Sequence, residues 1–138
     1  MTAKLINQLI RHEGMELKPY KDTVGKWTIG IGRNLSDIGI SEGEARSLLM
    51  NDLANVDLMI ERFMPWAKNL DPVRYDALMN FVFNVGIGTA LSFENAMAAL
   101  KASDFDTAAA ELLDSRWSTQ VGKRSEEVAE QIRTGEYQ

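Results

Sequence analysis

The sequence predicts a mainly α fold of the α+β class, with a small β-hairpin lobe and a larger helical lobe joined by a long helix. Six of the ten glycines lie between residues 14 and 43, which indicates a turn-rich, partly β region. The chain after this region is rich in Ala, Leu and Met at helical spacing. One apolar helical pattern runs from Ser41 to Pro65, and a helix of that length spans about 30 Å, enough to join two lobes.

The first predicted element is a helix that ends at Gly14. Apolar residues recur on one face between residues 5 and 10. Thr2 can cap the N-terminus of this helix, and Gly14 predicts a left-handed stop at its C-terminus. Glu13 is therefore expected at the C-terminal end of the helix.

Residues 17–35 predict a β-hairpin. Tyr20, Trp27 and Ile29 belong to the residue types that favour strands. The turn is expected at residues 22–25, where Gly25 can take a positive φ.

Helices account for the rest of the chain. Ser41 and Glu44 predict a capping box at the start of the long helix, and Pro65 ends it. Asp71 and Pro72 predict the start of a buried central helix, which Gly86 and Gly88 stop. Shorter helices are expected at about 93–100, 105–113 and 123–133. We expect one domain, 1–138, with the hairpin lobe at about 13–50, the helical lobe at about 1–12 plus 62–138, and a cleft between them.

Composition excludes several classes of function. The chain has no cysteine and one histidine, His12, so we expect no metal site and no cofactor. The net charge of −5 and the absence of a basic run argue against nucleic acid as a partner. No run approaches the roughly 20 apolar residues of a membrane helix, and the start lacks the features of a signal peptide, so no stable membrane association is expected.

Two carboxylates are candidates for catalysis. Glu13 faces the negative end of the helix dipole, which makes its ionisation more costly and suits a general acid. Asp22 begins a polar turn, where hydration and backbone N–H groups keep it ionised. Thr28 lies on the opposite strand, and its hydroxyl can help Asp22 hold a water molecule. On spacing alone, a solvated surface glutamate and a turn-forming aspartate are also consistent with the pattern.

Residues 13–32 read EGMELKPYKDTVGKWTIGIG. This segment closely resembles the catalytic hairpin of the phage-type lysozymes, glycoside hydrolase family 24, which includes the T-even phage lysozymes and many endolysins. The resemblance continues in NFVFNVG at 80–86, SRW at 115–117 and RTG at 133–135. It therefore covers nearly the whole chain and implies a lysozyme-like fold.

The resemblance implies a role for each candidate. Glu13 would be the general acid that protonates the glycosidic oxygen, and Asp22 and Thr28 would position water on the opposite face of the sugar. The substrate would be peptidoglycan, cut at the β-1,4 bond between N-acetylmuramic acid and N-acetylglucosamine, with inversion at the anomeric carbon.

The resemblance also implies supporting residues. Arg124 falls where the family has an arginine that pairs with the catalytic glutamate, and Phe83 matches an aromatic residue on the cleft wall. Arg33 replaces a histidine of the T-even proteins, and Asp52 matches the partner of that histidine. An Arg33–Asp52 ion pair is therefore expected.

Three features depart from the T-even proteins. Asn34, Ala96 and Glu111 occupy sugar-cleft positions where those proteins have Leu, Ser and Asn, so these substrate contacts differ. The segment between Arg33 and Asp52 is shorter, which predicts the loss of a third strand or a short helix. The chain is also acidic, whereas many relatives are basic, so long-range attraction to an anionic wall should be weak or repulsive.

Two other functions fit the same resemblance. A lytic transglycosylase cuts the same bond without water, but Asp22 and Thr28 argue against it. A non-catalytic peptidoglycan-binding or tail protein can keep the fold, but the intact catalytic residues argue against that. As a phage endolysin the chain would be a monomer, held in the host cytoplasm until a holin opens the membrane, after which it would act on the cell wall. A virion-associated or prophage-encoded lysozyme is also consistent with the resemblance.

Overall fold

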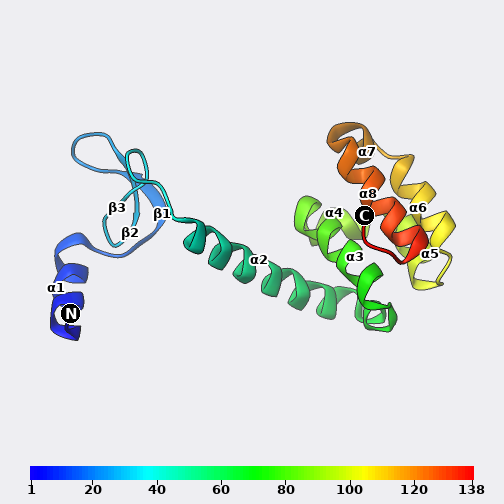
Figure 1. Cartoon of the computed structure of the whole chain (residues 1–138), viewed down its shortest axis with the longest axis horizontal. Helices are drawn as coiled ribbons and strands as arrows, with labels where there is room; N and C mark the ends of the chain where they lie inside the picture. The colour runs from blue at the N-terminus through cyan, green and yellow to red at the C-terminus, as the bar shows by residue number, and fades with distance from the viewer. The chain divides into compact units, whose positions relative to one another are not determined.

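A computed structural model describes residues 1–138 and divides them into two compact units. Unit 1 comprises Met1–Leu48 and unit 2 comprises Leu49–Gln138. The fold is mainly helical with one small antiparallel sheet, as the sequence predicts (Figure 1). The first helix falls in unit 1, and its predicted membership of the helical lobe stays a prediction.

Unit 1 begins with helix α1, Ala3–Glu13. The Leu5 N–H donates to the Thr2 Oγ1 at 3.3 Å, which confirms the predicted N-cap. Gly14 follows with φ +76° and donates its N–H to the Ile10 carbonyl at 2.8 Å. The helix therefore ends where predicted, but the ψ of 176° at Gly14 is extended and not left-handed helical.

The sheet of unit 1 has three strands in the order β1-β2-β3. Strand β1 (Glu16–Lys21) pairs with β2 (Trp27–Gly30), and β2 pairs with β3 (Arg33–Asn34). Thr28 lies opposite Tyr20 on one side and Asn34 on the other. Of the two expected losses, a third strand or a short helix, the loss of the strand is wrong because the two-residue β3 is present, and the loss of a short helix stays a prediction.

Strand β3 is fixed by a loop that folds back on β2. The Leu35 N–H donates to the Trp27 carbonyl at 2.7 Å, and the Trp27 N–H donates to the Ser36 Oγ at 2.9 Å. Asn34 and Asp37 exchange two hydrogen bonds at 2.9 and 3.0 Å. These polar contacts allow a short strand to persist despite the shortened segment that follows it.

Helix α2, Glu42–Phe63, has 22 residues and crosses the boundary between the units. The predicted capping box is present: the Glu44 N–H donates to the Ser41 Oγ at 3.1 Å, and the Ser41 N–H donates to the Glu44 Oε1 at 3.0 Å. The helix ends before Pro65, as predicted. A short 3-10 helix, η1 (Pro65–Asn69), follows it and was not predicted.

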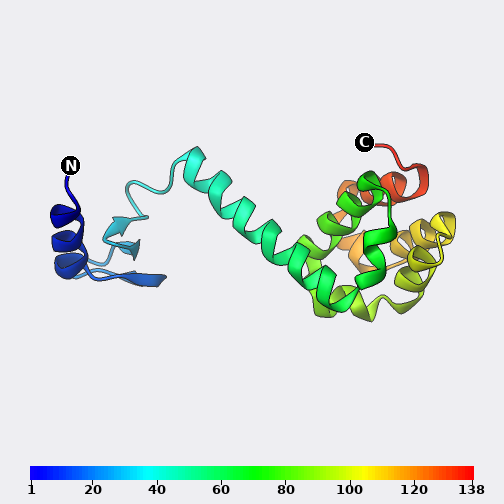
Figure 2. The same cartoon turned by 90° about the horizontal axis from the view of Figure 1, so that it is seen from below.

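The remaining helices of unit 2 form one bundle (Figures 1 and 2). Four of them confirm predicted helices: α3 (Pro72–Val85), α5 (Glu94–Lys101), α6 (Phe105–Leu113) and α8 (Lys123–Thr134). Two six-residue helices were not predicted: α4 (Ile87–Ser92) and α7 (Arg116–Val121).

The apolar core of unit 2 surrounds Phe81 of α3, which has no exposed surface. Its ring packs edge to face against Phe93 at 5.1 Å and Trp117 at 4.8 Å between ring centroids. Apolar residues of α5, α6 and α8 complete this core, among them Leu100, Leu112, Val128 and Ile132.

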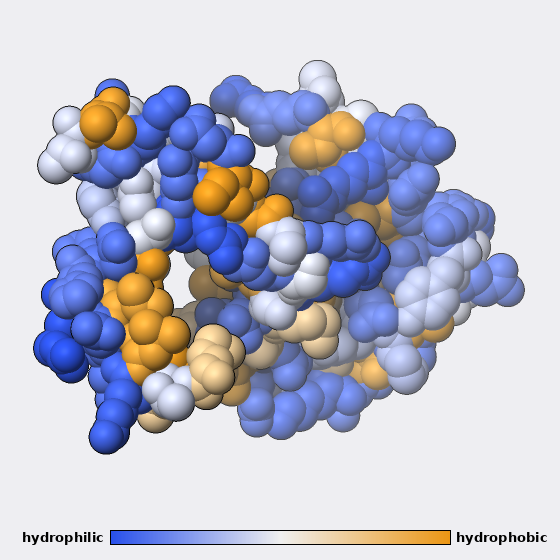
Figure 3. Space-filling model, turned by 60° about the vertical axis from the view of Figure 1, so that its left-hand side comes forward, coloured by the Kyte–Doolittle hydropathy of each residue, from blue (hydrophilic) through white to orange (hydrophobic).

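The face of the molecule seen in Figure 3 is largely hydrophilic, with several separate apolar patches. Large apolar side chains that remain exposed include Leu17, Val24, Ile38 and Leu58. None of the helices combines the length and the apolar character needed to cross a membrane.

Candidate active site

Glu13 is the last residue of α1, and its side chain lies against Gly32, in the turn between β2 and β3. A Cβ atom at Gly32 would lie only 2.8 Å from the Glu13 Oε2 and 3.0 Å from the Cδ. The carboxyl group therefore rests over the backbone of the turn, while the side chain stays exposed to solvent. The end of helix α1 therefore places this carboxyl group beside the turn of the sheet.

Asp22 comes directly after β1, at the start of the turn that leads to β2. Its Oδ1 accepts the N–H of Lys26 at 2.8 Å and that of Val24 at 3.0 Å. Its own N–H donates to the Lys26 carbonyl at 2.9 Å. Both backbone donors bind the same oxygen, which orients the carboxylate and leaves Oδ2 without a hydrogen bond.

Thr28, on β2, is the one buried residue of unit 1, with 4% of its surface exposed. Its hydroxyl donates to the Lys26 carbonyl at 3.0 Å. Because the proton is directed to that carbonyl, the lone pairs of the Thr28 Oγ1 can accept another hydrogen bond. The backbone of Lys26 thus holds both Asp22 and Thr28.

Asp22 and Thr28 together present two acceptors, the Asp22 Oδ2 and the Thr28 Oγ1. A water molecule has two O–H groups to donate, and a carboxylate can take up one of its protons. Each group is therefore of a kind that can bind a water molecule, and the Asp22 carboxylate is of a kind that can act as its base.

Within unit 1, Arg33 binds Glu44 and the backbone of Gly39. Its Nη1 donates to the Glu44 Oε1 at 2.7 Å and to the Gly39 carbonyl at 3.3 Å. The side-chain hydrogen bond from Arg33, with the Ser41 hydrogen bonds, lowers the pKa of Glu44 to about 2. Asp52 belongs to unit 2, so its pairing with Arg33 stays a prediction.

Asn34, predicted to contact substrate, is engaged within its own turn. Its Nδ2 donates to the Asp37 Oδ2, and its Oδ1 accepts the Asp37 N–H. Asn34 lies opposite Thr28 in the sheet register. Its amide therefore stabilises the turn after β3, and its contact with substrate stays a prediction.

Two of the predicted substrate-binding residues in unit 2 line the same hollow. Ala96, on α5, is buried, and Glu111, on α6, is half-buried. The hollow measures about 270 Å³. Its other lining residues are mostly polar: Ser92, Phe93, Glu94, Asn95, Asp114 and Ser115. Phe83, on α3, is 40% exposed and is not part of this hollow.

Arg124, on α8, is held by Asn80 of α3. Its Nε and Nη2 donate to the Asn80 Oδ1 at 3.0 and 2.8 Å. Its Nη2 also donates to the Asn80 carbonyl at 3.3 Å. Unit 2 therefore fixes the guanidinium group by itself, and the predicted pairing with Glu13 stays a prediction.

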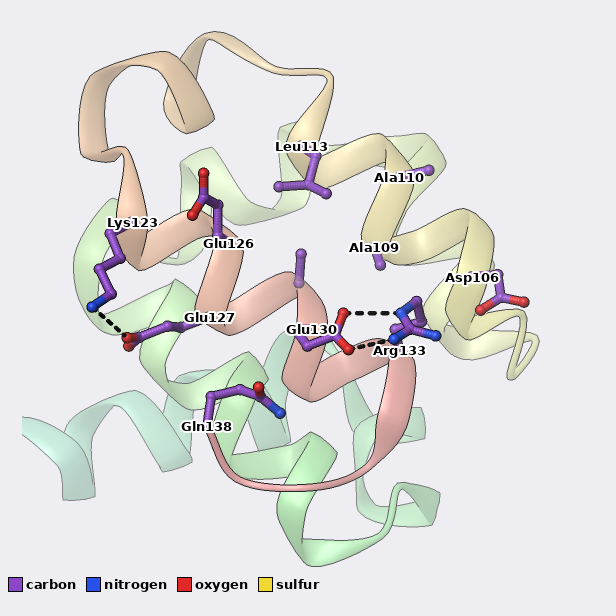
Figure 4. Close-up of a pocket in the computed structure, with 11 residues that line it drawn as sticks. Asp106, Ala109, Ala110, Leu113, Lys123, Glu126, Glu127, Glu130, Arg133 and Gln138 are labelled. Atoms are coloured by element: carbon purple, nitrogen blue, oxygen red, sulfur yellow. Dashed lines mark hydrogen bonds and ion pairs between the residues drawn. The ribbon is translucent and has the colours of Figure 1, made fainter.

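A second hollow, of about 510 Å³, lies between α6 and α8 (Figure 4). Its floor includes three alanines and its rim is charged. Lys123 pairs with Glu127 and Arg133 with Glu130, whereas Asp106 and Glu126 form no ion pair. None of the predicted site residues lines it, and no three His, Cys, Asp or Glu side chains of the chain are grouped to hold a metal ion.

The sequence pattern described as "Phage lysozyme" matches residues 10–133, which includes Glu13, Asp22 and Thr28. The chain belongs to the phage lysozyme family. This family of enzymes includes endolysins, and the match extends from the end of α1 to the end of α8.

Individual lysozymes and endolysins are similar over most of their length. "Probable T4-type lysozyme 1" and "Probable T4-type lysozyme 2" of Dictyostelium discoideum are 29% and 31% identical, over 98% of this chain and 96% of each relative. An endolysin of Acyrthosiphon pisum secondary endosymbiont phage 1 is 32% identical over 78% of this chain and 73% of its own length.

Three features of this lysozyme site were not predicted from the sequence. They are the hydrogen bonds of the Lys26 backbone to Asp22 and Thr28, the contact of Gly32 with Glu13, and the hydrogen bonds between Arg124 and Asn80. The third depends on a pairing of residues 44 positions apart that only the folded chain creates, whereas the first joins Lys26 to residues four and two positions away. A signal for the second was present, because the second glycine of TIGIG marks a backbone that a side chain does not fit.

Proposed function

We propose that this phage lysozyme hydrolyses the β-1,4 bond between N-acetylmuramic acid and N-acetylglucosamine in peptidoglycan, with inversion at the anomeric carbon. The observation that supports it most is that the backbone of Lys26 hydrogen-bonds to the side chains of both Asp22 and Thr28. It leaves the Asp22 Oδ2 and the lone pairs of Thr28 for one water molecule.

Glu13 acts as the general acid. It transfers its proton to the glycosidic oxygen while the bond between that oxygen and the anomeric carbon breaks. The exposed carboxyl group at the end of α1 is accessible to a polymeric substrate. The leaving sugar departs with a free hydroxyl.

Asp22 acts as the general base for the attacking water. The water oxygen forms the new bond to the anomeric carbon on the face opposite the leaving oxygen, and Asp22 takes up the released proton. Thr28 fixes the second O–H of the water. Because the new bond forms on the opposite face, the product is the α anomer.

A lytic transglycosylase is the competing reaction. It forms an anhydro sugar by attack of a hydroxyl group of the sugar itself and needs no bound water. A base and a hydroxyl acceptor held by the backbone of one residue, Lys26, favour hydrolysis over that route. A protein that only binds the wall has no need for a base and a hydroxyl acceptor arranged as Asp22 and Thr28 are.

Proton NMR of freshly cut wall oligosaccharide tests the stereochemistry, provided that spectra are taken before mutarotation. We expect the α anomer first. A β anomer formed first would indicate a covalent or substrate-assisted route and would remove Asp22 from the role of base.

Mass spectrometry of the same fragments tests the reaction class. A hydrolase adds one water to each cut, whereas a transglycosylase leaves anhydro ends of lower mass. Anhydro ends as the main product would overturn the proposal, as would an absence of new ends from a folded protein.

The sugar chain extends beyond the cleaved bond, so further contacts are needed. We propose that the hollow lined by Ala96 and Glu111 takes part of it, and that Phe83 offers an exposed aromatic face to a sugar ring. Release through a holin and the monomeric state belong to the same proposal.

A further inference from the structure

The Glu13 side chain, the predicted general acid, lies so close to Gly32 that a side chain at position 32 would not fit beside it. A Cβ atom at Gly32 would lie 2.8 Å from the Glu13 Oε2, 3.0 Å from the Cδ and 3.2 Å from the Cγ. Contacts below 3.0 Å do not occur at real Cβ atoms, so either the turn or the glutamate would have to move. The glutamate is the exposed and flexible partner.

Gly30 provides an internal comparison two residues earlier. Its φ is +69° and that of Gly32 is +72°, so a side chain at either position strains the backbone to a similar degree. A Cβ atom at Gly30, however, meets no atom within 4 Å. The two glycines therefore share the backbone requirement and differ in their contact with Glu13.

No hydrogen bond holds the Glu13 side chain in the structure. Its neighbour Gly14 fixes the end of α1, and the carboxyl then extends over the hydrogen-only face of Gly32. The carboxyl group thus lies close to the Gly32 backbone without a hydrogen bond or an ion pair to hold it there.

We propose that Gly32 is a positioning residue for Glu13: the missing side chain leaves the volume in which the carboxyl group lies. A methyl group there displaces the carboxyl from the glycosidic oxygen. A misplacement of about 1 Å can reduce a rate by about 10²-fold. The expected effect on rate rests on the proposed role of Glu13 as the general acid. The contact between Gly32 and Glu13 is independent of that role.

The first test observes the contact without reference to activity. With ¹³C-labelled glutamate, the Glu13 carboxyl resonance is assigned by its loss in Glu13→Gln. We expect Gly32→Ala to shift this resonance, and Gly30→Ala to leave it in place. An unchanged resonance in Gly32→Ala would overturn the proposal.

The second test is a kinetic cycle. We expect Gly32→Ala to lower kcat by about 10²-fold relative to Gly30→Ala, with little change in KM. In a Glu13→Gln background the acid is already missing, so Gly32→Ala should add no further loss. A similar loss in both backgrounds would show that Gly32 acts through the fold and not through Glu13.

A stability cycle covers the case in which Gly32→Ala does not fold. Glu13→Ala removes the atoms that a Cβ would meet, so Gly32→Ala and Gly30→Ala should then lower Tm equally. A persistent extra loss for Gly32→Ala would overturn the proposal. If instead the resonance shifts but Glu13→Gln retains full activity, the proposed function fails and the contact stands.

Discussion

The two units hold their predicted functional residues in different ways. In unit 1, Asp22, Thr28 and Asn34 are fixed by hydrogen bonds to backbone atoms, and Thr28 is the one buried residue. In unit 2, an apolar core around Phe81 supports the helices that carry Phe83, Ala96 and Glu111. A turn of polar residues can aim a carboxylate accurately, but it buries little apolar surface and so adds little to stability.

The units also differ in charge. Residues 1–48 contain seven Lys and Arg against six Asp and Glu, whereas residues 49–138 contain eight against fourteen. The acidity of the whole chain therefore comes from unit 2, and the unit with the predicted catalytic residues is nearly neutral. The comparison predicts that substitutions at the predicted catalytic residues of unit 1 change activity with little effect on stability, and that substitutions in the core of unit 2 change stability.

The largest effect is expected from Glu13→Gln. The amide keeps the shape of the side chain but has no acidic proton to transfer, so activity should fall by about 10²–10⁴-fold while Tm stays unchanged or rises. A turbidity assay on permeabilised cells and a thermal melt measure the two quantities. Glu16→Gln, which removes an exposed acid from β1, is the matched control. Near-normal lysis by folded Glu13→Gln would refute the assignment.

Phe81→Ala tests the other side of the comparison. Phe81 has no exposed surface and contacts two aromatic rings, so the substitution should lower the free energy of unfolding by about 3–5 kcal/mol. Urea denaturation measures it. Phe83→Ala, on the same helix but 40% exposed, should cost clearly less. Equal losses would mean that the core of unit 2 lies elsewhere.

A smaller effect on unit 2 is expected at the start of α3. The Asp71 Oδ2 accepts the Arg74 N–H at 3.1 Å, and its Oδ1 accepts the Arg74 Nη1 at 3.0 Å. Asp71→Ala removes this N-cap and should cost about 1 kcal/mol. Asp71→Asn keeps a capping oxygen and should cost less. The urea midpoints of the two variants should therefore differ, and coincident midpoints would contradict the capping role.

Unit 1 should respond to acid through Glu44. Arg33 and Ser41 lower the pKa of Glu44 from 4.5 to about 2, so their hydrogen bonds favour the folded state fully above pH 4.5. This contribution is lost as the pH falls from 4.5 to about 2. Glu44→Gln lacks it, so the urea midpoints of the variant and the parent should converge over that range. A constant difference from pH 6 to pH 2 would contradict this.

The smallest expected effect concerns salt. Because unit 2 carries the excess negative charge, moderate salt should raise the activity at low ionic strength by screening repulsion from an anionic wall. Replacing Asp106 and Glu126, which are not among the predicted site residues, by Asn and Gln should weaken this rise. If activity falls steadily from the lowest salt concentration, the negative charge of unit 2 does not control how the protein approaches the wall.

Local signals account for the elements that were predicted correctly. Thr2 caps α1, Ser41 and Glu44 cap α2, and Gly135 ends α8 with φ +72°. Each signal acts over at most one helical turn, so it can be read from neighbouring residues. The spacing of Glu13, Asp22 and Thr28 is also local, because all three lie within 16 residues of sequence and on adjoining elements.

The elements that were missed depend on distant partners. Helix α7 has six residues, too few to be stable alone, and its Trp117 Nε1 donates to the Asn84 Oδ1 at 2.7 Å across 33 residues of sequence. Strand β3 exists because residues 35 and 36 fold back on Trp27. A pattern within a short window cannot contain such pairings.

By itself the sequence determined the caps and ends of the long helices, the position of the hairpin turn, and which residue types stand at the predicted site. Only the tertiary structure decided that Arg33 pairs with Glu44, that Asn80 holds Arg124, and that Glu13 lies against Gly32. The physical reason is the separation along the sequence of the residues that interact. Capping and helical periodicity act between residues three or four apart, whereas the last contact joins the end of a helix to a turn 19 residues later, and only folding brings the two together.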